Sequence, residues 1–416
     1  MILRYFFLFV FLTSLFCAGC NNDSGNSAPE KSDNYVVMLS LDGFRWDYPD
    51  SIATPNLDRI AKKGVKAKSL KPAFPTKTFP NHYSMATGLY PDHHGLVLNS
   101  FYDPETEKSY SMIDSASRNN PLFYAGEPIW ETTEKNGLTA ATFFWVGSDV
   151  RRAKNKATYW EPYNQKIPFS ARIDSVINWL KLPEEKRPEL IMWYMHEPDA
   201  IGHYAGPHAA PTDSVVRRLD SMLGIFLNKI DQLPFKDQIN IIVTSDHGMG
   251  KISNDRVVDL SKYTDSTWFS RVEGHNPNYL FQVKQGYLDT AFKALSRVEH
   301  ISVWKHGEVP EELNYGNNPR TLDLIVLADS AWSITYGKKE IKYAATHGFD
   351  NRNKDMHAIF YAFGPDFKEN YTSETFENVD LYILISKLLN LKPAETDGNI
   401  NRIKPMLKQG VVKNTK

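Results

Sequence analysis

The chain has 416 residues, of which 42% are hydrophobic and 23% are charged, and its formal net charge is -1. This composition is typical of a globular protein with enough apolar residues for a large core. The near-neutral charge, without a long block of one sign, argues against a nucleic-acid-binding surface.

The first residues are typical of an export signal. MILRYFFLFVFLTSLFCAGC has one early arginine, an apolar run and small residues before Cys20. Its end, CAGC, resembles a bacterial lipobox with Cys20 as the lipidated residue. We expect residues 1–19 to be a lipoprotein signal peptide, 20–33 a polar tether, 34–400 a single domain and 401–416 a C-terminal tail. The protein would then be exported and held in the cell envelope by its lipid, with no other membrane contact.

Three apolar runs each end in polar side chains. YVVMLSLD ends at Asp42, LIMWYMHEPD ends at Asp199, and INIIVTSDH ends at Asp246 and His247. The runs are nearly continuous rather than alternating, which is typical of strands covered on both faces. Helical patterns separate them, TPNLDRIAKKG and PTDSVVRRLDSMLGIFLNKI, so the sequence predicts a mostly parallel α/β sheet. Ligands of such sheets bind beyond the carboxyl ends of the strands, where these side chains should converge.

Further candidates extend this set of metal-ligating residue types. Asp199 and His203 are four residues apart, within reach of one ion if the segment is helical, and ATHGFDN contains His347. The full set is Asp42, Thr78, Asp199, His203, Asp246, His247 and His347. Nitrogen and oxygen ligands without sulfur suit zinc, less often manganese or iron, and argue against calcium, and a set of this size divides between two ions about 4 Å apart. Taken singly, each residue is as well explained by a helix cap, a turn or a surface pair.

The segment PTKTFPNHYS, residues 75–84, precedes a helical pattern and contains two threonines, Thr76 and Thr78. A threonine hydroxyl is a poor nucleophile near neutral pH unless another group activates it. The segment has no obvious base, so the activating group must come from elsewhere in the chain. The residues alone leave open a surface loop that ends in a helix cap.

Six motifs in order carry a family resemblance. They are LDGFR, PTKTFPNHYSMATGLYPDHHG, FFWVGSDV, EPDAIGHYAGP, SDHGM and THGFDN. With these motifs the chain resembles the nucleotide pyrophosphatase/phosphodiesterase family, within the alkaline phosphatase superfamily. The resemblance implies an alkaline-phosphatase-like α/β/α sandwich with a mostly parallel central sheet, and it implies two Zn2+ ions. One ion would be bound by Asp199, His203 and His347, and the other by Asp42, Asp246, His247 and Thr78.

The resemblance also implies the roles of individual residues. Thr78 would attack phosphorus in line and form a phosphothreonyl intermediate, whereas Thr76 would be a turn or packing residue. Asn99 matches the family's asparagine that hydrogen-bonds a phosphoryl oxygen. Apart from the resemblance, we interpret the remaining histidines as structural or surface residues, with His82 and His196 as the best candidates to contact the ligands. The expected substrate-binding residues are Phe79, Trp145, Asp149 and Tyr163, with Phe79 and Tyr163 on either side of a nucleobase.

The implied function is a zinc-dependent phosphodiesterase/pyrophosphatase. It would hydrolyse nucleotide phosphodiester or phosphoanhydride bonds and release nucleoside 5′-monophosphates. Three alternatives stay open: a phosphodiesterase for phospholipid or choline-type diesters, a phosphate monoesterase, and a non-catalytic surface lipoprotein.

The chain departs from the family pattern at two places near the expected base pocket. Val146 replaces the usual proline, and Ser117 or Arg118 stands where nucleotide-cleaving vertebrate members have a lysine. Monoesterases of the superfamily have a lysine and an arginine around the GSDV position to neutralise the extra charge of a monoester. Arg151 and Arg152 are out of register for this role, and we interpret them as surface cations.

Overall fold

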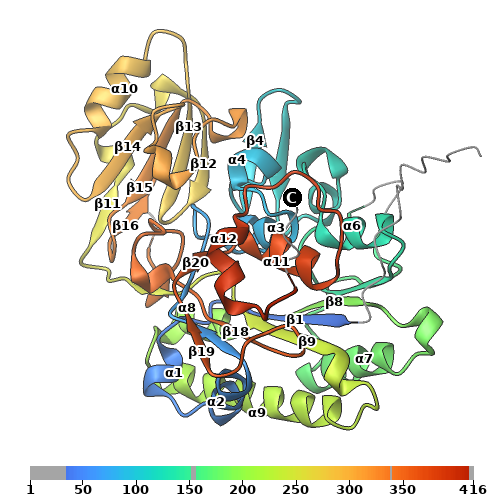
Figure 1. The fold of residues 1–416 in the computed structure, drawn as a ribbon. Helices are drawn as coiled ribbons and strands as arrows, with labels where there is room; N and C mark the ends of the chain where they lie inside the picture. Colours follow the sequence, from blue (N-terminus) through green and yellow to red (C-terminus); the bar gives the residue numbers. More distant parts are fainter. Residues whose placement is uncertain (1–33, 151–155, 338–339, 412–416) are drawn as a thin grey trace, which may run out of the picture.

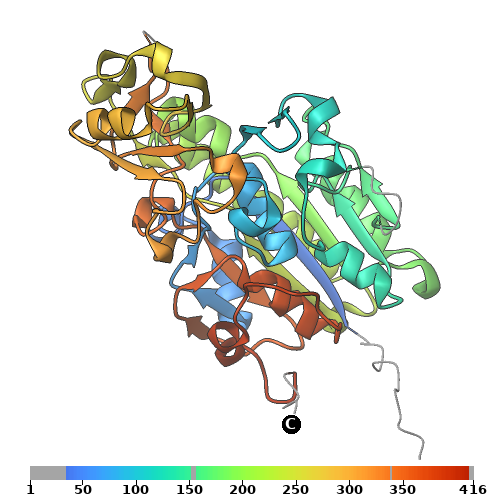
Figure 2. The ribbon, with the colours of Figure 1, turned by 90° about the horizontal axis from the view of Figure 1, so that it is seen from above.

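The computed structural model describes residues 34–150, 156–337 and 340–411. The expected signal peptide and tether with Cys20 lie outside the described residues, as do Arg151 and Arg152. Figure 1 shows a large sheet between two layers of helices, with a smaller sheet to one side. Figure 2 shows from above that the smaller sheet lies at one end of the large one.

The large sheet has eight strands and is mostly parallel. Its strands lie in the order β19 (Tyr371–Ser373), β2 (Val65–Ala67), β18 (Phe360–Phe363), β9 (Ile239–Thr244), β1 (Tyr35–Leu41), β8 (Leu190–Met195), β6 (Ala140–Phe143) and β7 (Tyr159–Glu161). Only β18 runs antiparallel to its two neighbours. The three strands predicted from apolar runs are β1, β8 and β9, and they are adjacent, with β1 between the other two.

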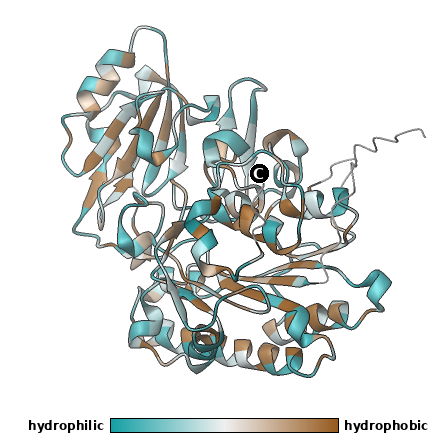
Figure 3. Ribbon diagram, in the orientation of Figure 1, coloured by the Kyte–Doolittle hydropathy of each residue, from teal (hydrophilic) through white to brown (hydrophobic). Residues whose placement is uncertain are grey.

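Strand β1 is covered on both faces, which explains its continuous apolar sequence. Val37 and Leu39 belong to one hydrophobic cluster, and Val36 and Met38 belong to another. Neighbouring side chains of a strand point to opposite faces, so each face needs apolar residues of its own. Figure 3 shows the hydrophobic residues gathered on the central strands and on the helix surfaces that face them.

Helices cover the two faces of the large sheet. One face is covered by α2 (Pro55–Lys63), α7 (Phe169–Leu180) and α9 (Ala210–Ile230), and the other by α3 (Thr78–Thr87), α6 (Ile129–Lys135), α11 (Asp380–Leu388) and α12 (Ile400–Ile403). In α9, the buried residues Leu219, Leu223, Phe226 and Ile230 recur at helical spacing on the side that faces the core. Both helical patterns identified in the sequence, now α2 and α9, are confirmed.

The smaller sheet is antiparallel and has a hydrophobic cluster of its own. Its strands lie in the order β12 (Phe269–His275), β13 (Asn278–Val283), β15 (Leu324–Ala328) and β14 (Ile301–Lys305), with α10 (Leu288–Leu295) packed beside them. Its other face contributes Leu280, Ile325 and Leu327 to a cluster that also contains Phe74 and Tyr83. This shared cluster fixes the smaller sheet beside the start of α3.

Short elements complete the described chain. The strand pairs are β3 (Leu70–Lys71) with β20 (Phe376–Glu377), β4 (Ser100–Asp103) with β5 (Lys108–Ser111), β10 (Gly250–Lys251) with β17 (Ala345–Thr346), and β11 (Val257–Asp259) with β16 (Ser333–Thr335). The short helices are α1 (Tyr48–Ser51), α4 (Pro91–His94), α5 (Ser115–Arg118) and α8 (Asp199–Ala205).

The chain remains packed beyond residue 400, where we expected the tail to begin. Ile403, Met406 and Leu407 are buried in the cluster that also covers one face of the large sheet. None of the helices in the described ranges has the length and apolar character needed to cross a membrane. The predicted fold class, an α/β/α sandwich around a mostly parallel sheet, is confirmed by the strand order and by the helix layers.

Gly43 allows two strand ends to approach closely. Its φ is +69°, and a Cβ built on it would lie 2.9 Å from the Cα atom of Asp199. Only glycine adopts such a φ without cost, and no other residue leaves room for the loop that follows β8. A hydrogen bond of 2.9 Å, from the amide of Asp199 to the carbonyl of Asp42, stabilises this close approach.

We predict that Gly43→Ala lowers the free energy of unfolding by about 2–4 kcal/mol, because the added methyl group imposes backbone strain and also a clash. The matched control is Gly137→Ala. Gly137 has a φ of +78° with no atom within 4 Å of the built Cβ. Its substitution by alanine should therefore lower the free energy of unfolding by only about 1 kcal/mol. Urea unfolding of both variants measures the difference, and equal losses would contradict the close approach.

Candidate active site

The candidate residues meet at the carboxyl ends of three adjacent strands. Asp42 follows β1, Asp246 and His247 follow β9, and Asp199 begins α8 just after β8. The amide of Asp42 donates to the carbonyl of Met195 over 3.0 Å, which ties the end of β1 to the end of β8. Parallel strands in register end at one edge of the sheet, so the convergence predicted from the sequence is confirmed.

Each of the three carboxylates at this edge of the sheet has one oxygen without a hydrogen-bond partner. Within the described residues, the buried atoms Oδ1 of Asp42, Oδ1 of Asp199 and Oδ2 of Asp246 have none. Burial and the charges of Asp246 and Asp199 raise the pKa of Asp42 well above its usual value. Unpaired buried carboxylate oxygens are costly, so the arrangement calls for positive charge among them.

Three histidines are oriented by backbone carbonyls. The Nδ1 atoms of His203, His247 and His347 lie 2.9, 2.8 and 2.7 Å from the carbonyl oxygens of Ala345, Gly248 and Thr76. Each Nδ1–H can donate to its carbonyl, which leaves Nε2 as a lone-pair donor to a cation. This is the usual arrangement of metal-binding histidines in proteins. Burial, followed by the proximity of His247, Lys77 and His203, holds the pKa of His347 well below its usual value.

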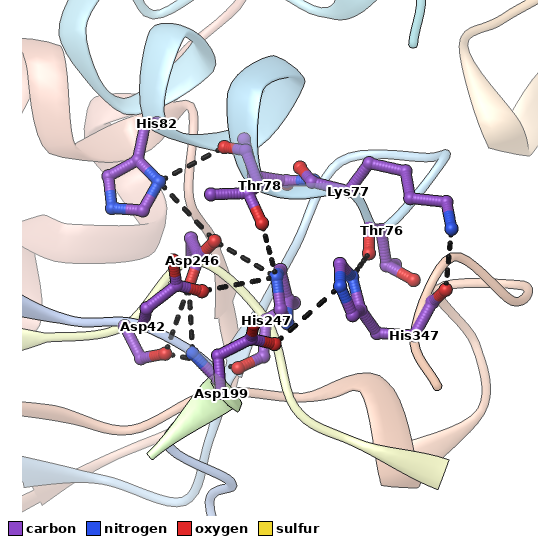
Figure 4. A network of polar contacts seen from close by, with 12 residues as sticks. Asp42, Thr76, Lys77, Thr78, His82, Asp199, Asp246, His247 and His347 are labelled. Atoms are coloured by element: carbon purple, nitrogen blue, oxygen red, sulfur yellow. Dashed lines mark hydrogen bonds and ion pairs between the residues drawn. The ribbon is translucent and has the colours of Figure 1, made fainter. Parts of the chain in front are cut away.

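Two groups of these side chains could each hold a metal ion. One is Asp42, Asp246 and His247, and the other is Asp199, His247 and His347, with ligand atoms within 4.8 Å of one another in each group. Nε2 of His247 lies 3.0 Å from Oδ2 of Asp246 and 3.4 Å from Oδ1 of Asp42. Figure 4 shows Asp42 and Asp246 on one side of His247 and His347 on the other.

His203 joins the second group through Asp199. Its Nε2 lies 3.4 Å from Oδ1 of Asp199, and Nε2 of His347 lies 3.6 Å from the same oxygen. Asp199 and His203 are one turn apart in α8, as the sequence spacing suggested. The division expected from the family places His247 with the first group alone, whereas its ring also stacks on His347 with centroids 3.6 Å apart. His247 therefore lies between the two groups.

Thr78 is the first residue of α3 and lies against this centre. Its Oγ1 is 3.1 Å from Nε2 of His247, and its side chain is half-buried. The backbone N–H groups at the start of the helix attract negative charge. His82, one turn later, lies with Nδ1 3.3 Å from Oδ2 of Asp246 and with Nε2 2.9 Å from the hydroxyl of Ser40. His82 thus contacts a candidate ligand, as expected.

Asn99 lies beside Thr78 and is oriented by the backbone of α3. The amide N–H of Phe79 donates to Oδ1 of Asn99 over 3.0 Å. This contact uses the acceptor end of the side-chain amide and leaves its NH2 group as a donor. A phosphoryl oxygen next to Thr78 would meet that donor.

Thr76 and Lys77 hold the turn that contains His347. The hydroxyl of Thr76 accepts from the amide of Gly348 over 2.8 Å and donates to the carbonyl of Phe349 over 3.1 Å. The ammonium of Lys77 donates to the carbonyl of His347 over 2.9 Å. The segment before α3 is therefore fastened to a loop more than 260 residues away.

A cavity of about 450 Å³ opens beside Thr78 and contains the expected substrate residues. Phe79, Trp145, Asp149 and Tyr163 all line it. The ring of Tyr163 is 43% exposed, whereas Trp145 is 2% exposed and donates its indole N–H to the carbonyl of His82 over 3.0 Å. Tyr163 and the half-buried Phe79 therefore offer ring surface to a ligand, and Trp145 forms the back of the wall.

The structure adds contacts at this site that the sequence analysis did not predict. Tyr194 donates its hydroxyl to Oδ2 of Asp42, and Arg118 lines the cavity with Nε 3.9 Å from Oδ2 of Asp149. Tyr194 lies inside the apolar run of β8, where its hydroxyl gave no signal distinct from a core aromatic. His196, which was a candidate to contact the ligands, lines the cavity, but the contacts found for it among the described residues are with Arg172, whose guanidinium lies 3.4 Å from its Nδ1, and with Phe169.

Comparison with known proteins agrees with the fold and shows the family. Residues 36–350 match the family model described as Type I phosphodiesterase / nucleotide pyrophosphatase. Human ectonucleotide pyrophosphatase/phosphodiesterase family member 5 is 34% identical over 373 residues, which are 89% of this chain and 78% of the human protein. Venom phosphodiesterase 2 of Crotalus adamanteus is 35% identical over 386 residues, but the match spans only 47% of that protein and 90% of this chain.

Solved structures give the same result. Murine ectonucleotide pyrophosphatase / phosphodiesterase 5, solved as an inactive threonine-to-alanine variant in complex with AMP, superposes with a TM-score of 0.86 at 34% identity. The match covers 90% of this chain and all of that one. The fold and site define an enzyme built around a polar centre at the edge of a parallel sheet. The chain belongs to the type I phosphodiesterase / nucleotide pyrophosphatase family.

The two threonines of PTKT should respond to substitution in opposite ways. We predict that Thr76→Val lowers the free energy of unfolding by about 1–3 kcal/mol, because it leaves the buried amide of Gly348 and carbonyl of Phe349 without partners. Thr78→Ala should cost less than about 0.5 kcal/mol, because its half-buried side chain supports no loop, but it should abolish turnover. Urea unfolding and turnover of both variants test this, and an activity loss confined to Thr76→Val would refute the choice of nucleophile.

Proposed function

We propose that the protein is a zinc-dependent phosphodiesterase/pyrophosphatase that cleaves nucleotide phosphodiester or phosphoanhydride bonds and releases nucleoside 5′-monophosphates. The observation that carries the proposal is the position of Thr78. Its hydroxyl lies 3.1 Å from Nε2 of His247, which belongs to both candidate metal groups, and Thr78 lines a cavity that also contains the rings of Phe79 and Tyr163.

The donor set fits two zinc ions. It offers imidazole nitrogens and carboxylate oxygens, and three of its buried oxygens have no hydrogen-bond partner in the described chain. One ion would be held by Asp42, Asp246 and His247 with Thr78, and the other by Asp199, His203 and His347. When bound, the ions would lower the pKa of the Thr78 hydroxyl and neutralise charge on the phosphoryl and leaving oxygens.

Individual residues of the chain would then carry out the separate steps of the reaction. Oγ1 of Thr78 gives up its proton to solvent and forms a bond to phosphorus as the bond to the leaving oxygen breaks in line. This gives a phosphothreonine that still carries the nucleoside, and the leaving group departs with the electron pair of the broken bond. The NH2 group of Asn99 and the N–H groups at the start of α3 receive the negative phosphoryl oxygens. Water then attacks phosphorus and releases the monophosphate, which restores the hydroxyl of Thr78.

The first cavity favours a nucleoside over a small substituent. Phe79 and Tyr163 give it ring surface on which a base can stack, and such stacking contributes about 1–3 kcal/mol. The murine relative binds AMP, and a threonine-to-alanine change accompanies its inactivity, which supports the same ligand class and the same nucleophile type for this chain. Among the described residues, Arg118 is a cation that lines this cavity; its Nε lies 3.9 Å from Oδ2 of Asp149, and its Nη1 donates to the carbonyl of Met112 over 3.0 Å.

We also propose that the enzyme is exported and lipid-anchored in the cell envelope. The support is the CAGC sequence at Cys20 and the apolar run before it. A polar tether of residues 20–33 would hold the catalytic domain away from the membrane surface.

The nucleotide proposal is tested with two diesters that share one leaving group. We predict that Tyr163→Ala lowers kcat/KM for the p-nitrophenyl ester of thymidine monophosphate about 5- to 150-fold, because one stacking face is lost. Methyl p-nitrophenyl phosphate, which has a methyl group in place of the nucleoside, should lose much less.

The control is Tyr263→Ala, which removes another tyrosine that is 49% exposed and does not line the cavity. It should alter neither rate constant. Equal losses on both esters in Tyr163→Ala would remove the basis for a nucleotide pocket. Absence of turnover on both esters by the unaltered enzyme would contradict the phosphodiesterase itself.

A further inference from the structure

A second cavity is lined by lysines and has a volume of about 610 Å³. Its wall contains Lys368, Lys404 and Lys408, and no acidic side chain is among the described residues that line it. Lys404 and Lys408 are exposed, whereas Lys368 is half-buried. Like charges gathered around one hollow repel one another, so this lysine cavity attracts anions.

Two paired segments of the backbone form the wall of the lysine cavity. The amide of Lys368 donates to the carbonyl of Met406 over 3.0 Å, and the amide of Lys408 donates to the carbonyl of Asp366 over 2.8 Å. The ammonium group of Lys368 also donates to the carbonyl of Pro405 over 2.6 Å. These contacts fix the positions from which the lysine side chains extend, so their charge is gathered at one place on the surface.

The same backbone segment fastens the start of the described chain. Oδ2 of Asp366 accepts from the side-chain amide of Asn34 over 2.8 Å and from that of Asn240 over 2.7 Å. The expected tether, residues 20–33, joins Asn34 to Cys20, and a flexible coil of that length spans about 20 Å on average. With the proposed lipid on Cys20, the lysine cavity would therefore be held near the membrane surface.

The lysine cavity and the candidate active site lie toward opposite edges of the large sheet. Strand β1 begins after Asn34 and ends before Asp42, and its seven residues span about 23 Å. Because β18 runs antiparallel to β9, the loop after Phe363, which contains Lys368, leaves the sheet at the edge where β1 begins. A membrane at this edge would leave the cavity beside Thr78 facing the water.

We propose that the lysine cavity docks on anionic phospholipid headgroups and that this contact orients the domain on the membrane. The inference rests on the lipid anchor proposed above, and it adds a contact to the lipid that the sequence predicted as the only one. Each basic residue near an anionic bilayer raises the affinity about fivefold, and a lipid chain combined with a basic patch anchors a protein more firmly than the chain alone.

A soluble polyanion is the alternative ligand of such a cavity. The position of Asn34 favours the membrane, because the tether brings this part of the surface, and not the opposite edge of the sheet, close to the lipid. A neighbouring cavity, which shares the loop after β18, is less selective for anions, since four basic and three acidic residues line it.

The test measures how the full-length chain binds two kinds of vesicle, one of phosphatidylcholine and one of an equal mixture of phosphatidylcholine and phosphatidylglycerol. Cys20→Ser in every sample removes the lipid, so the ratio of the partition coefficients, mixed over neutral vesicles, reports on the protein surface. We predict that Lys404→Gln combined with Lys408→Gln lowers this ratio about 10- to 50-fold, because two of the three positive charges are lost.

The matched control is Lys262→Gln combined with Lys293→Gln, which removes two exposed lysines on the side of the smaller sheet. It should change the ratio less than about twofold. Equal ratios in the two double variants would overturn the docking surface. A lysine-dependent affinity for heparin without any preference for the mixed vesicles would also overturn it, because the ligand would then be a soluble polyanion.

The lipid anchor and the enzyme have separate readouts. Mass spectrometry of the chain, purified from the membranes of cells that express it with its signal sequence, should show a lipid on Cys20. Absence of that lipid would overturn the anchor and the proposed orientation together. Turnover of the thymidine ester should be unchanged in both lysine variants, since none of the four lysines lines the cavity beside Thr78. An unaltered chain without turnover would count against the proposed enzyme and leave the vesicle result standing.

Discussion

The mutual repulsion of three carboxylates, of which Asp42 and Asp246 are buried and Asp199 is half-buried, is the constraint on which the rest of this structure depends. The register of the sheet pairs Leu41 with Met195 and Ser40 with Thr244, so β1, β8 and β9 end side by side. Asp42, Asp199 and Asp246 follow those ends, and each has one buried carboxylate oxygen without a hydrogen-bond partner among the described residues. Such a group of like charges is stable only with cations, or with protons that neutralise some of them.

The surroundings of the centre keep its donor atoms in place. Backbone carbonyls orient three histidines, Tyr194 donates to Asp42, and Thr76 and Lys77 fasten the turn of His347 to the start of α3. These contacts join segments that are distant in the sequence and belong to different layers. The only cysteines of the chain are Cys17 and Cys20, so packing, hydrogen bonds and bound cations must hold those segments together.

Part of this arrangement could be predicted from the sequence, because the relevant signals are local. The apolar runs of β1, β8 and β9 are continuous, the helical spacing in α2 and α9 is regular, and acidic residues stand at the strand ends. The family resemblance added Asn99 and the residues of the first cavity. All of these side chains lie at or beside one centre in the structure.

The remainder depends on contacts between distant segments, which leave no local signal. The smaller sheet was not predicted, and its attachment arises when Leu280, Ile325 and Leu327 complete a cluster with Phe74 and Tyr83. Tyr343 and Tyr204 are ordinary surface tyrosines in the sequence, and only the fold brings their rings together beside His203. The sequence therefore predicted the residues of the site better than it predicted the shape of the surfaces around them.

Anomalous X-ray diffraction from crystals of the zinc-loaded protein tests the central claim most directly. Data collected above and below the zinc absorption edge should show two zinc peaks about 4 Å apart, each within about 2.0–2.3 Å of its ligand atoms. One peak should touch Asp42, Asp246 and His247, and the other Asp199, His203 and His347. The account would be contradicted if crystals grown with excess zinc showed no zinc peak among these side chains.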